Sequence, residues 1–141
     1  MPKDVLFELG CEEIPARFMP KLCNDFETLI ASACLKERLS NDGISVMGSY
    51  RRLVIIIKNC SDIQSDLDEI IIGPPSSIAL NEHNQLTKAG QGFLRKNYVS
   101  ESDYLIKTIK GRDVLCVSKH IEGLSAMIIL PSLLRDCVYN I

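Results

Sequence analysis

Hydrophobic and polar residues alternate along the chain with two different periods, which predict strands and helices in turn. Val5–Leu9 is a short apolar run that ends at Gly10, a pattern typical of a strand followed by a tight turn. From residue 19 to residue 33, apolar side chains recur every three or four positions, which predicts an amphipathic helix. Pro15 and Pro20 both suit first-turn positions. Either a short turn therefore precedes a helix that begins at Pro20, or a single helix bends there.

Two further apolar runs predict strands after this helix, which we expect to end at residues 41–43. Leu53–Ile57 contains five successive apolar residues, four of them β-branched, which favours a strand covered on both faces and central in its sheet. Ile70–Ile72 predicts another strand. We expect it to stop at Gly73-Pro74-Pro75, because proline cannot donate a ladder hydrogen bond.

The second half of the chain predicts a helix, a hairpin and a final helix. Thr87 is suited to cap a helix that runs through Tyr98. The β-rich runs 104–109 and 114–119 flank a glycine-containing connection, which is typical of a hairpin. The last segment has an approximate apolar stripe that Pro131 interrupts, so a kink or a new helix start is expected there. The stripe consists of Leu124, Met127, Ile128, Leu134 and Val138.

The predicted order of elements is β-α-β-β-α-β-β-α. Hairpins and helices in this mixture favour an α+β fold, in which helices pack on one face of a mostly antiparallel sheet. A chain of 141 residues is long enough for one compact core and short for two domains, so we expect residues 1–141 to form a single domain or part of one. The apolar pattern still runs at Ile141, without a capping glycine or a polar tail, which indicates an amino-terminal fragment of a longer chain.

Composition narrows the class of protein and its location. The chain has 16 Lys and Arg against 18 Asp and Glu, so there is no global positive field, but residues 87–141 hold 8 basic and 5 acidic side chains. An anionic partner is therefore expected to favour that part. No apolar run approaches the ~20 residues of a membrane-spanning helix, and no signal peptide is evident, so we expect a cytoplasmic protein. The six cysteines lack any C-x-x-C pair, which predicts small buried side chains and no zinc site.

The charged residues offer little catalytic chemistry. Glu8, Glu12 and Glu13 have no accompanying nucleophile or metal-ligand set, and Glu12 or Glu13 is better suited to cap the start of a helix. Arg51-Arg52 precedes a buried strand. Successive strand residues point to opposite faces, so we expect one arginine to pair with a carboxylate and favour a structural pair of Glu8 with Arg51.

The glycine pair at positions 90 and 92 and the two histidines do not indicate a nucleotide-binding or catalytic site. Gly90-x-Gly92 lacks the spacing of a phosphate-binding loop, and His83 and His120 are expected to be ordinary surface residues. The face that carries Lys88, Arg95 and Lys96 could meet an RNA backbone electrostatically. It continues along the sequence to Lys107, Lys110 and Arg112.

Four sequence blocks resemble the β subunit of bacterial heterotetrameric glycyl-tRNA synthetases. Phe7–Ala16 resembles the opening of that family, and Ser49–Val54 its Thr-Pro-Arg-Arg-Leu segment. Ile72–Pro74 resembles the family's Gly-Pro strand exit, and Thr87–Phe93 its Thr-Lys-Ala-x-x-Gly-Phe segment. The departures from the family pattern are mild: Cys11 replaces a usual Thr, Ser49-Tyr50 replaces Thr-Pro, and Gly90 replaces a common Ala.

The resemblance implies a ligase of two α and two β subunits that attaches glycine to tRNA(Gly) in the cytoplasm with ATP and Mg²⁺. In that family the α subunit carries the active site, while the β subunit supplies tRNA binding and assembly. The expected partners are therefore the α subunit, separate or fused to β, and tRNA(Gly), with no membrane or DNA. The chain itself is expected to bind no cofactor and to have no catalytic residues.

We therefore predict a noncatalytic amino-terminal portion of this β subunit, with candidate tRNA or subunit contacts at Arg52, Lys88, Arg95 and Lys96. Two alternatives stay open. The first is a free-standing protein-interaction domain with no RNA role, which docks on a partner through its apolar final helix. The second is a thiol enzyme that uses Cys11.

Overall fold

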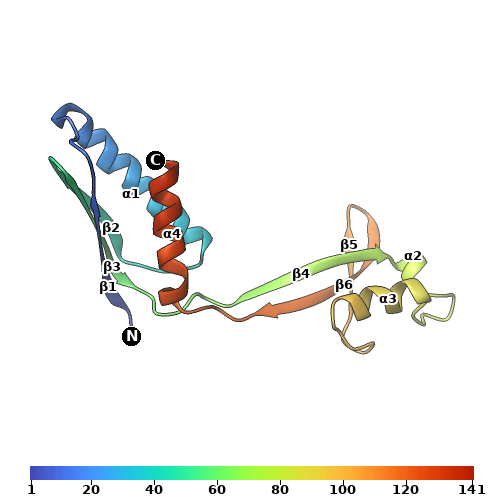
Figure 1. The fold of residues 1–141 in the computed structure, drawn as a ribbon. Helices are drawn as coiled ribbons and strands as arrows, with labels where there is room; N and C mark the ends of the chain where they lie inside the picture. The colour runs from blue at the N-terminus through green and yellow to red at the C-terminus, as the bar shows by residue number, and fades with distance from the viewer. The chain divides into compact units, whose positions relative to one another are not determined.

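The computed structural model describes residues 1–141 and divides into two compact units (Figure 1). Unit 1 comprises residues 1–65 and 122–141, and unit 2 comprises residues 66–121. Each unit has its own three-stranded antiparallel sheet and its own hydrophobic cluster. The α+β class is confirmed, but the expectation of one sheet over one core is wrong. The cause is the middle segment, which contains enough strands and helices to bury a cluster of its own. The single-domain interpretation stays a prediction.

Unit 1 is a sheet covered on one face by two helices. The sheet order is β1-β3-β2, so the apolar run at 53–57 is central as predicted, and Ile55 and Ile57 are fully buried. Figure 1 shows α1 and α4 on the same side of this sheet, where Phe26 and Ile30 of α1 join the core. The elements of unit 1 are β1 (Lys3–Gly10), the 3₁₀ turn η1 (Ala16–Phe18), α1 (Met19–Lys36), β2 (Gly43–Ser49), β3 (Arg52–Cys60) and α4 (Ala126–Asn140).

The start of α1 distinguishes between the two predictions for Pro15 and Pro20, and its end differs from the predicted one. Pro20 lies in the first turn of α1 and η1 precedes it, so the short turn before the helix is confirmed. α1 ends at Lys36 rather than at residues 41–43, because Arg38 adopts a left-handed conformation with φ of 55°. Because the helix ends early, β2 can begin at Gly43. The sequence pattern did not predict this strand.

The final helix has a different buried face from the one predicted. Met127 and Ile128 are 82% and 63% exposed, and of the predicted stripe only Leu134 is buried. Leu124 lies before the N-cap Ser125, and the six-residue step from Ile128 to Leu134 is a turn of about 240°, so the predicted residues do not share one face of the helix. The helix also continues through Pro131 instead of restarting there. The residues buried on α4 are Ala126, Leu130, Leu133, Leu134 and Cys137.

Gln64 joins the two chain segments of unit 1, residues 1–65 and 122–141, through hydrogen bonds. Its backbone N–H donates to the Leu124 carbonyl oxygen at 2.9 Å, and the Leu124 N–H donates to Gln64 Oε1 at 3.0 Å. Gln64 Nε2 donates to the Glu37 carbonyl oxygen at 2.8 Å. Gly123 passes so near that a Cβ there would lie 2.6 Å from the Gln64 carbonyl carbon. The side chain of Gln64 is therefore buried, and both its oxygen and its nitrogen form hydrogen bonds.

Unit 2 is built around the predicted hairpin. Its sheet order is β4-β6-β5, and Lys110 and Gly111 at the hairpin turn both have positive φ. β4 continues through Gly73–Pro75 instead of stopping there, because it is an edge strand, where a missing proline donor is tolerated. The elements of unit 2 are β4 (Leu67–Pro75), α2 (Ser76–Ala79), α3 (Lys88–Lys96), β5 (Leu105–Ile109) and β6 (Arg112–Ile121).

The N-cap of α3 is confirmed. Thr87 Oγ1 accepts from the Gly90 N–H at 3.3 Å, and the helix ends at Lys96, two residues earlier than predicted. Tyr98 has φ of 56°, which is incompatible with a continued helix. Leu94 of α3 packs with Leu115 and Val117 in the core of unit 2. No helix in either unit combines the length and the apolar character that crossing a membrane requires.

Candidate functional site

The four sequence blocks meet in pairs, one pair in each unit. In unit 1 the loop after β1 lies against the turn between β2 and β3. The Cys11 N–H donates to the Arg51 carbonyl oxygen at 3.0 Å, and the Ile14 N–H donates to the Tyr50 carbonyl oxygen at 2.9 Å. These backbone hydrogen bonds join the first block, Phe7–Ala16, to the second, Ser49–Val54.

In unit 2 the third and fourth blocks pack together through glycines. A Cβ on Gly73 would lie 2.5 Å from the ring of Phe93. The ring can therefore pack on β4 only because residue 73 has no side chain. The Thr87 N–H donates to the Ala79 carbonyl oxygen at 2.9 Å, and a Cβ on Gly90 would lie 2.5 Å from the same oxygen. Close backbone approach therefore fixes α3 against α2 and β4.

We call the exposed end of unit 1 formed by the first two blocks and η1 the loop–turn surface. The Arg17 guanidinium lies 4.7 Å from the centroid of the Phe18 ring, within cation–π range. The Glu13 carboxylate raises the pKa of the Tyr50 hydroxyl, because ionisation would remove the proton that the phenol can share with the carboxylate. The surface is defined by Glu12, Glu13, Arg17, Phe18, Tyr50, Arg51 and Arg52.

The four predicted contact residues lie in different units. Arg52 is the first residue of β3 in unit 1, opposite Gly10 and Ser49. Lys88, Arg95 and Lys96 are exposed on α3 in unit 2, away from its buried residue Leu94. None of the four takes part in an ion pair, so each charge is available to a ligand.

The structure tests the roles predicted for the glutamates of the first block, which were helix capping and pairing with an arginine. Neither η1 nor α1 has a side-chain cap, so the capping role expected for Glu12 or Glu13 is wrong, and Glu13 instead faces Tyr50. Glu8 lies opposite Val54 on the sheet, and Arg51 lies in the β2–β3 turn. The ion pairs of the structure involve other residues, so the pairing of Glu8 with Arg51 stays a prediction.

One polar cluster was not found by sequence reasoning. His120 Nδ1 lies 2.7 Å from Asp68 Oδ1, and His120 Nε2 lies 3.4 Å from Asp66 Oδ2. His120 and Asp68 are register partners across β6 and β4, and only the strand register reveals this. No group of three or more His, Cys, Asp or Glu side chains is arranged to hold a metal ion.

All six cysteines are free thiols, and four of them are buried. Burial raises the pKa of Cys34 from 9.0 to about 11, with smaller contributions from the neighbouring thiols of Cys60 and Cys137. These three side chains belong to the core of unit 1. At neutral pH they are therefore inert, nonpolar packing groups rather than nucleophiles.

We expect unit 1 to lose stability between about pH 9 and 11 because of Cys34. Below pH 9 the thiol is neutral in both the folded and the unfolded chain. Above that pH the unfolded chain releases a proton that the folded chain retains, so the free energy of unfolding falls, by roughly 2–3 kcal/mol at pH 11. Urea titrations from pH 8 to 11 measure this loss. The Cys34→Ala variant should show a shallower pH dependence, and an identical slope would contradict the assignment.

These two pairs of blocks, in this order along the chain, point to a subunit of an aminoacyl-tRNA synthetase. The family model described as "Glycyl-tRNA synthetase beta subunit" matches residues 5–141. The chain belongs to the glycyl-tRNA synthetase β subunit family.

Curated relatives are similar along the whole chain. It is 37% identical over 141 residues to a glycine–tRNA ligase β subunit of Citrifermentans bemidjiense and 36% over 142 residues to that of Geotalea daltonii, and each match covers 100% of this chain and 20% of the relative. The β subunit of Oceanobacillus iheyensis is 34% identical over 131 residues, which cover 93% of this chain and 19% of the relative. The chain thus spans about a fifth of the length of these relatives.

Proposed function

We propose that the chain is a noncatalytic portion of a glycine–tRNA ligase β subunit, which supports ATP-dependent attachment of glycine to tRNA(Gly) in the cytoplasm through tRNA binding, subunit assembly or both. The main support is the family match over residues 5–141, together with three unpaired cations on α3. The proposed partners are the α subunit and tRNA(Gly).

The proposed mechanism is positioning. A subunit that holds tRNA beside the active site of its partner lowers the entropic cost of bringing the reactants together, without moving a proton itself. The residues of this chain do not fit ATP or Mg²⁺. Gly90 and Gly92 lie inside α3 rather than in a phosphate loop, and no acidic group is arranged to hold a metal ion. We assign ATP and Mg²⁺ to the α subunit.

The proposed tRNA contact is the exposed side of α3. Lys88 and Arg95 are seven residues apart, so they project from nearly the same side of the helix. Arg95 and Lys96 occupy the last turn, where the negative end of the helix dipole favours cations. Three cations on one short helix are suited to phosphate groups of an RNA backbone, which is bound largely through charge.

The test is charge reversal of Lys88, Arg95 and Lys96 to glutamate in the assembled ligase. We expect tRNA affinity to fall at least about tenfold at low salt. The salt dependence should also become shallower, by up to about 0.7–0.9 in the log–log slope per lost phosphate contact. Binding is measured by filter retention or fluorescence anisotropy across salt concentrations.

The matched control reverses Lys3, Lys21 and Lys36 in unit 1, which changes the net charge equally. Unchanged affinity and unchanged salt slope in the α3 variant would contradict the proposed tRNA contact. An equal loss in both variants would show only an effect of overall charge and would contradict it as well.

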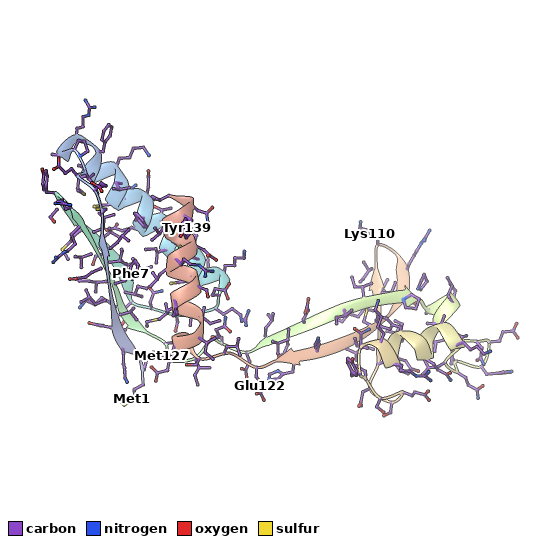
Figure 2. All side chains as sticks on the ribbon, viewed as in Figure 1. Met1, Phe7, Lys110, Glu122, Met127 and Tyr139 are labelled. Atoms are coloured by element: carbon purple, nitrogen blue, oxygen red, sulfur yellow. The ribbon has the colours of Figure 1, made fainter.

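A second candidate function is docking on a partner protein through α4. The observation that favours it is the exposure of Met127 and Ile128 on α4, with Leu124 just before the helix and Tyr139 near its end (Met127 and Tyr139 are labelled in Figure 2). The charge-reversal experiment separates the two candidates. A variant that keeps full tRNA affinity within an intact complex favours the docking function.

A further inference from the structure

A cavity of about 670 Å³ lies in unit 1, between the sheet and the first part of α4. Its walls are formed by β1, by the end of β3 with the residues that follow it, and by α4 from its N-cap to Leu134. The volume falls within the range of about 300–1,000 Å³ that is typical of small-molecule sites. Phe7 on β1 and Met127 on α4, which both line the cavity, are labelled in Figure 2. The apolar lining residues include Val5, Phe7, Cys60, Ala126, Leu130 and Leu134.

Ser61 adds a polar group to this apolar lining. Its Oγ is buried and forms no hydrogen bond within the chain. The backbone around it is fixed, because the Ser61 N–H donates to the Ser40 carbonyl oxygen at 2.9 Å and the Ala126 N–H donates to the Asp62 carbonyl oxygen at 2.7 Å. Buried hydroxyl groups are rarely left unpaired. The desolvation of this hydroxyl is already complete, so a hydrogen bond from a ligand would be gained without a further penalty on the side of the protein.

Pro131 changes the hydrogen bonding of the α4 wall. It lies inside the helix and has no N–H, so the Met127 carbonyl oxygen lacks the amide donor that a regular helix would supply. Both residues line the cavity. The polar groups that Ser61 and Met127 offer are a hydroxyl and a carbonyl oxygen, and both are uncharged. A hydroxyl group of a ligand can donate to either oxygen, whereas an ionised group would lose its hydration there without a countercharge.

The charged residues of the cavity wall favour a small molecule over a protein segment as its occupant. Asp4 pairs with Lys58 at 2.8 Å, Asp62 pairs with the N-terminal ammonium group of Met1, and both ion pairs are exposed to solvent. A protein segment laid across the cavity would remove water from these charges, which is costly. This holds for a partner subunit, a second copy and another segment of the same chain alike. A molecule that fits within the cavity leaves the charges solvated.

We propose that this cavity is a binding site for a small, uncharged, mainly aliphatic molecule that carries a hydroxyl group. The aliphatic part of the ligand packs against the apolar walls, and its hydroxyl group hydrogen-bonds with Ser61 Oγ. The inference goes beyond the proposed function and does not depend on it, because the cations of α3 belong to unit 2 and the cavity belongs to unit 1.

The experiment measures binding of 1-octanol to the assembled ligase by isothermal titration calorimetry, with octanoate as the charged analogue. We expect saturable binding of 1-octanol with a Kd below about 1 mM. Ser61→Ala should weaken it about five- to tenfold through the lost hydrogen bond. The matched control is Ser132→Ala, because Ser132 is an exposed serine of α4 that does not line the cavity. Far-UV circular dichroism verifies that both variants fold.

Saturable binding of 1-octanol that Ser61→Ala weakens and Ser132→Ala leaves unchanged supports the inference. Equal affinity of the parent chain and the Ser61→Ala variant would overturn it, and so would tighter binding of octanoate than of 1-octanol. Binding that is absent from the assembled ligase and present only in the separated β chain would show that a protein segment fills the cavity, which also overturns the inference. None of these outcomes depends on tRNA affinity, so the charge reversals on α3 test the proposed function separately.

Discussion

Replacing Gly123 by alanine is expected to lower the free energy of unfolding of unit 1 by about 3 kcal/mol or more. The new Cβ would overlap the carbonyl group of Gln64, with 2.6 Å to its carbon and less to its oxygen. Both are backbone atoms, so the chain segments must separate rather than rotate a side chain. Separation breaks the two hydrogen bonds between Gln64 and Leu124 and leaves buried polar groups unpaired, at about 1–3 kcal/mol each.

Urea unfolding followed by circular dichroism measures this loss. The matched control is Gly10→Ala in the same unit, because a Cβ on Gly10 would meet nothing within 4 Å. We expect the control to change stability by less than about 0.5 kcal/mol. If both variants unfold at the same urea concentration as the parent chain, the close approach of Gly123 to Gln64 does not exist in solution.

Gly90→Ala is expected to destabilise unit 2 by about 2 kcal/mol, although alanine is the better helix former. In an exposed helix the replacement would gain about 1 kcal/mol. At Gly90 the added Cβ would lie 2.5 Å from the Ala79 carbonyl oxygen and 3.0 Å from Leu86 Cδ2. α3 would have to move away from α2, and the core around Leu94 would loosen.

Gly92→Ala in the same helix is the control, because a Cβ there would meet nothing within 4 Å. We expect it to raise the free energy of unfolding by up to about 1 kcal/mol. Thermal or urea unfolding of the two variants should therefore shift in opposite directions. A stabilising Gly90→Ala substitution would contradict the packing of α3 on α2.

Local features were predictable from the sequence because they depend on neighbouring residues. The β-branched run at 53–57 predicts the central strand, and Thr87 predicts the N-cap of α3. β2 was missed because Gly43 and Gly48 flank a short alternation of Ile44 and Val46. The division into two sheets also depends on which strands pair, and pairing between distant segments leaves no local pattern.

The candidate site was predictable as residues but not as an arrangement. Exposed cations on α3 follow from helical periodicity around the buried Leu94. The contact between Cys11 and Arg51 joins positions 40 residues apart, and only the pairing of β1 with β3 brings them together. The buried stripe of α4 was mispredicted because the predicted residues were not all three or four positions apart, whereas the buried residues of α4 recur at that spacing.

The connection between the two units has a consequence for the order of folding. The chain leaves unit 1 after Ser65 and returns at Glu122, and the bridge between Ile63 and Ser125 joins the two crossings. Unit 2 pairs its own ends, since Leu67 and Ile121 are register partners of β4 and β6. Once unit 2 has folded, α4 reaches its place by closing a loop of a few residues instead of one of about sixty, which reduces the entropic penalty of assembly. A chain in which unit 2 folds slowly would therefore expose the apolar side of α4 for longer during synthesis.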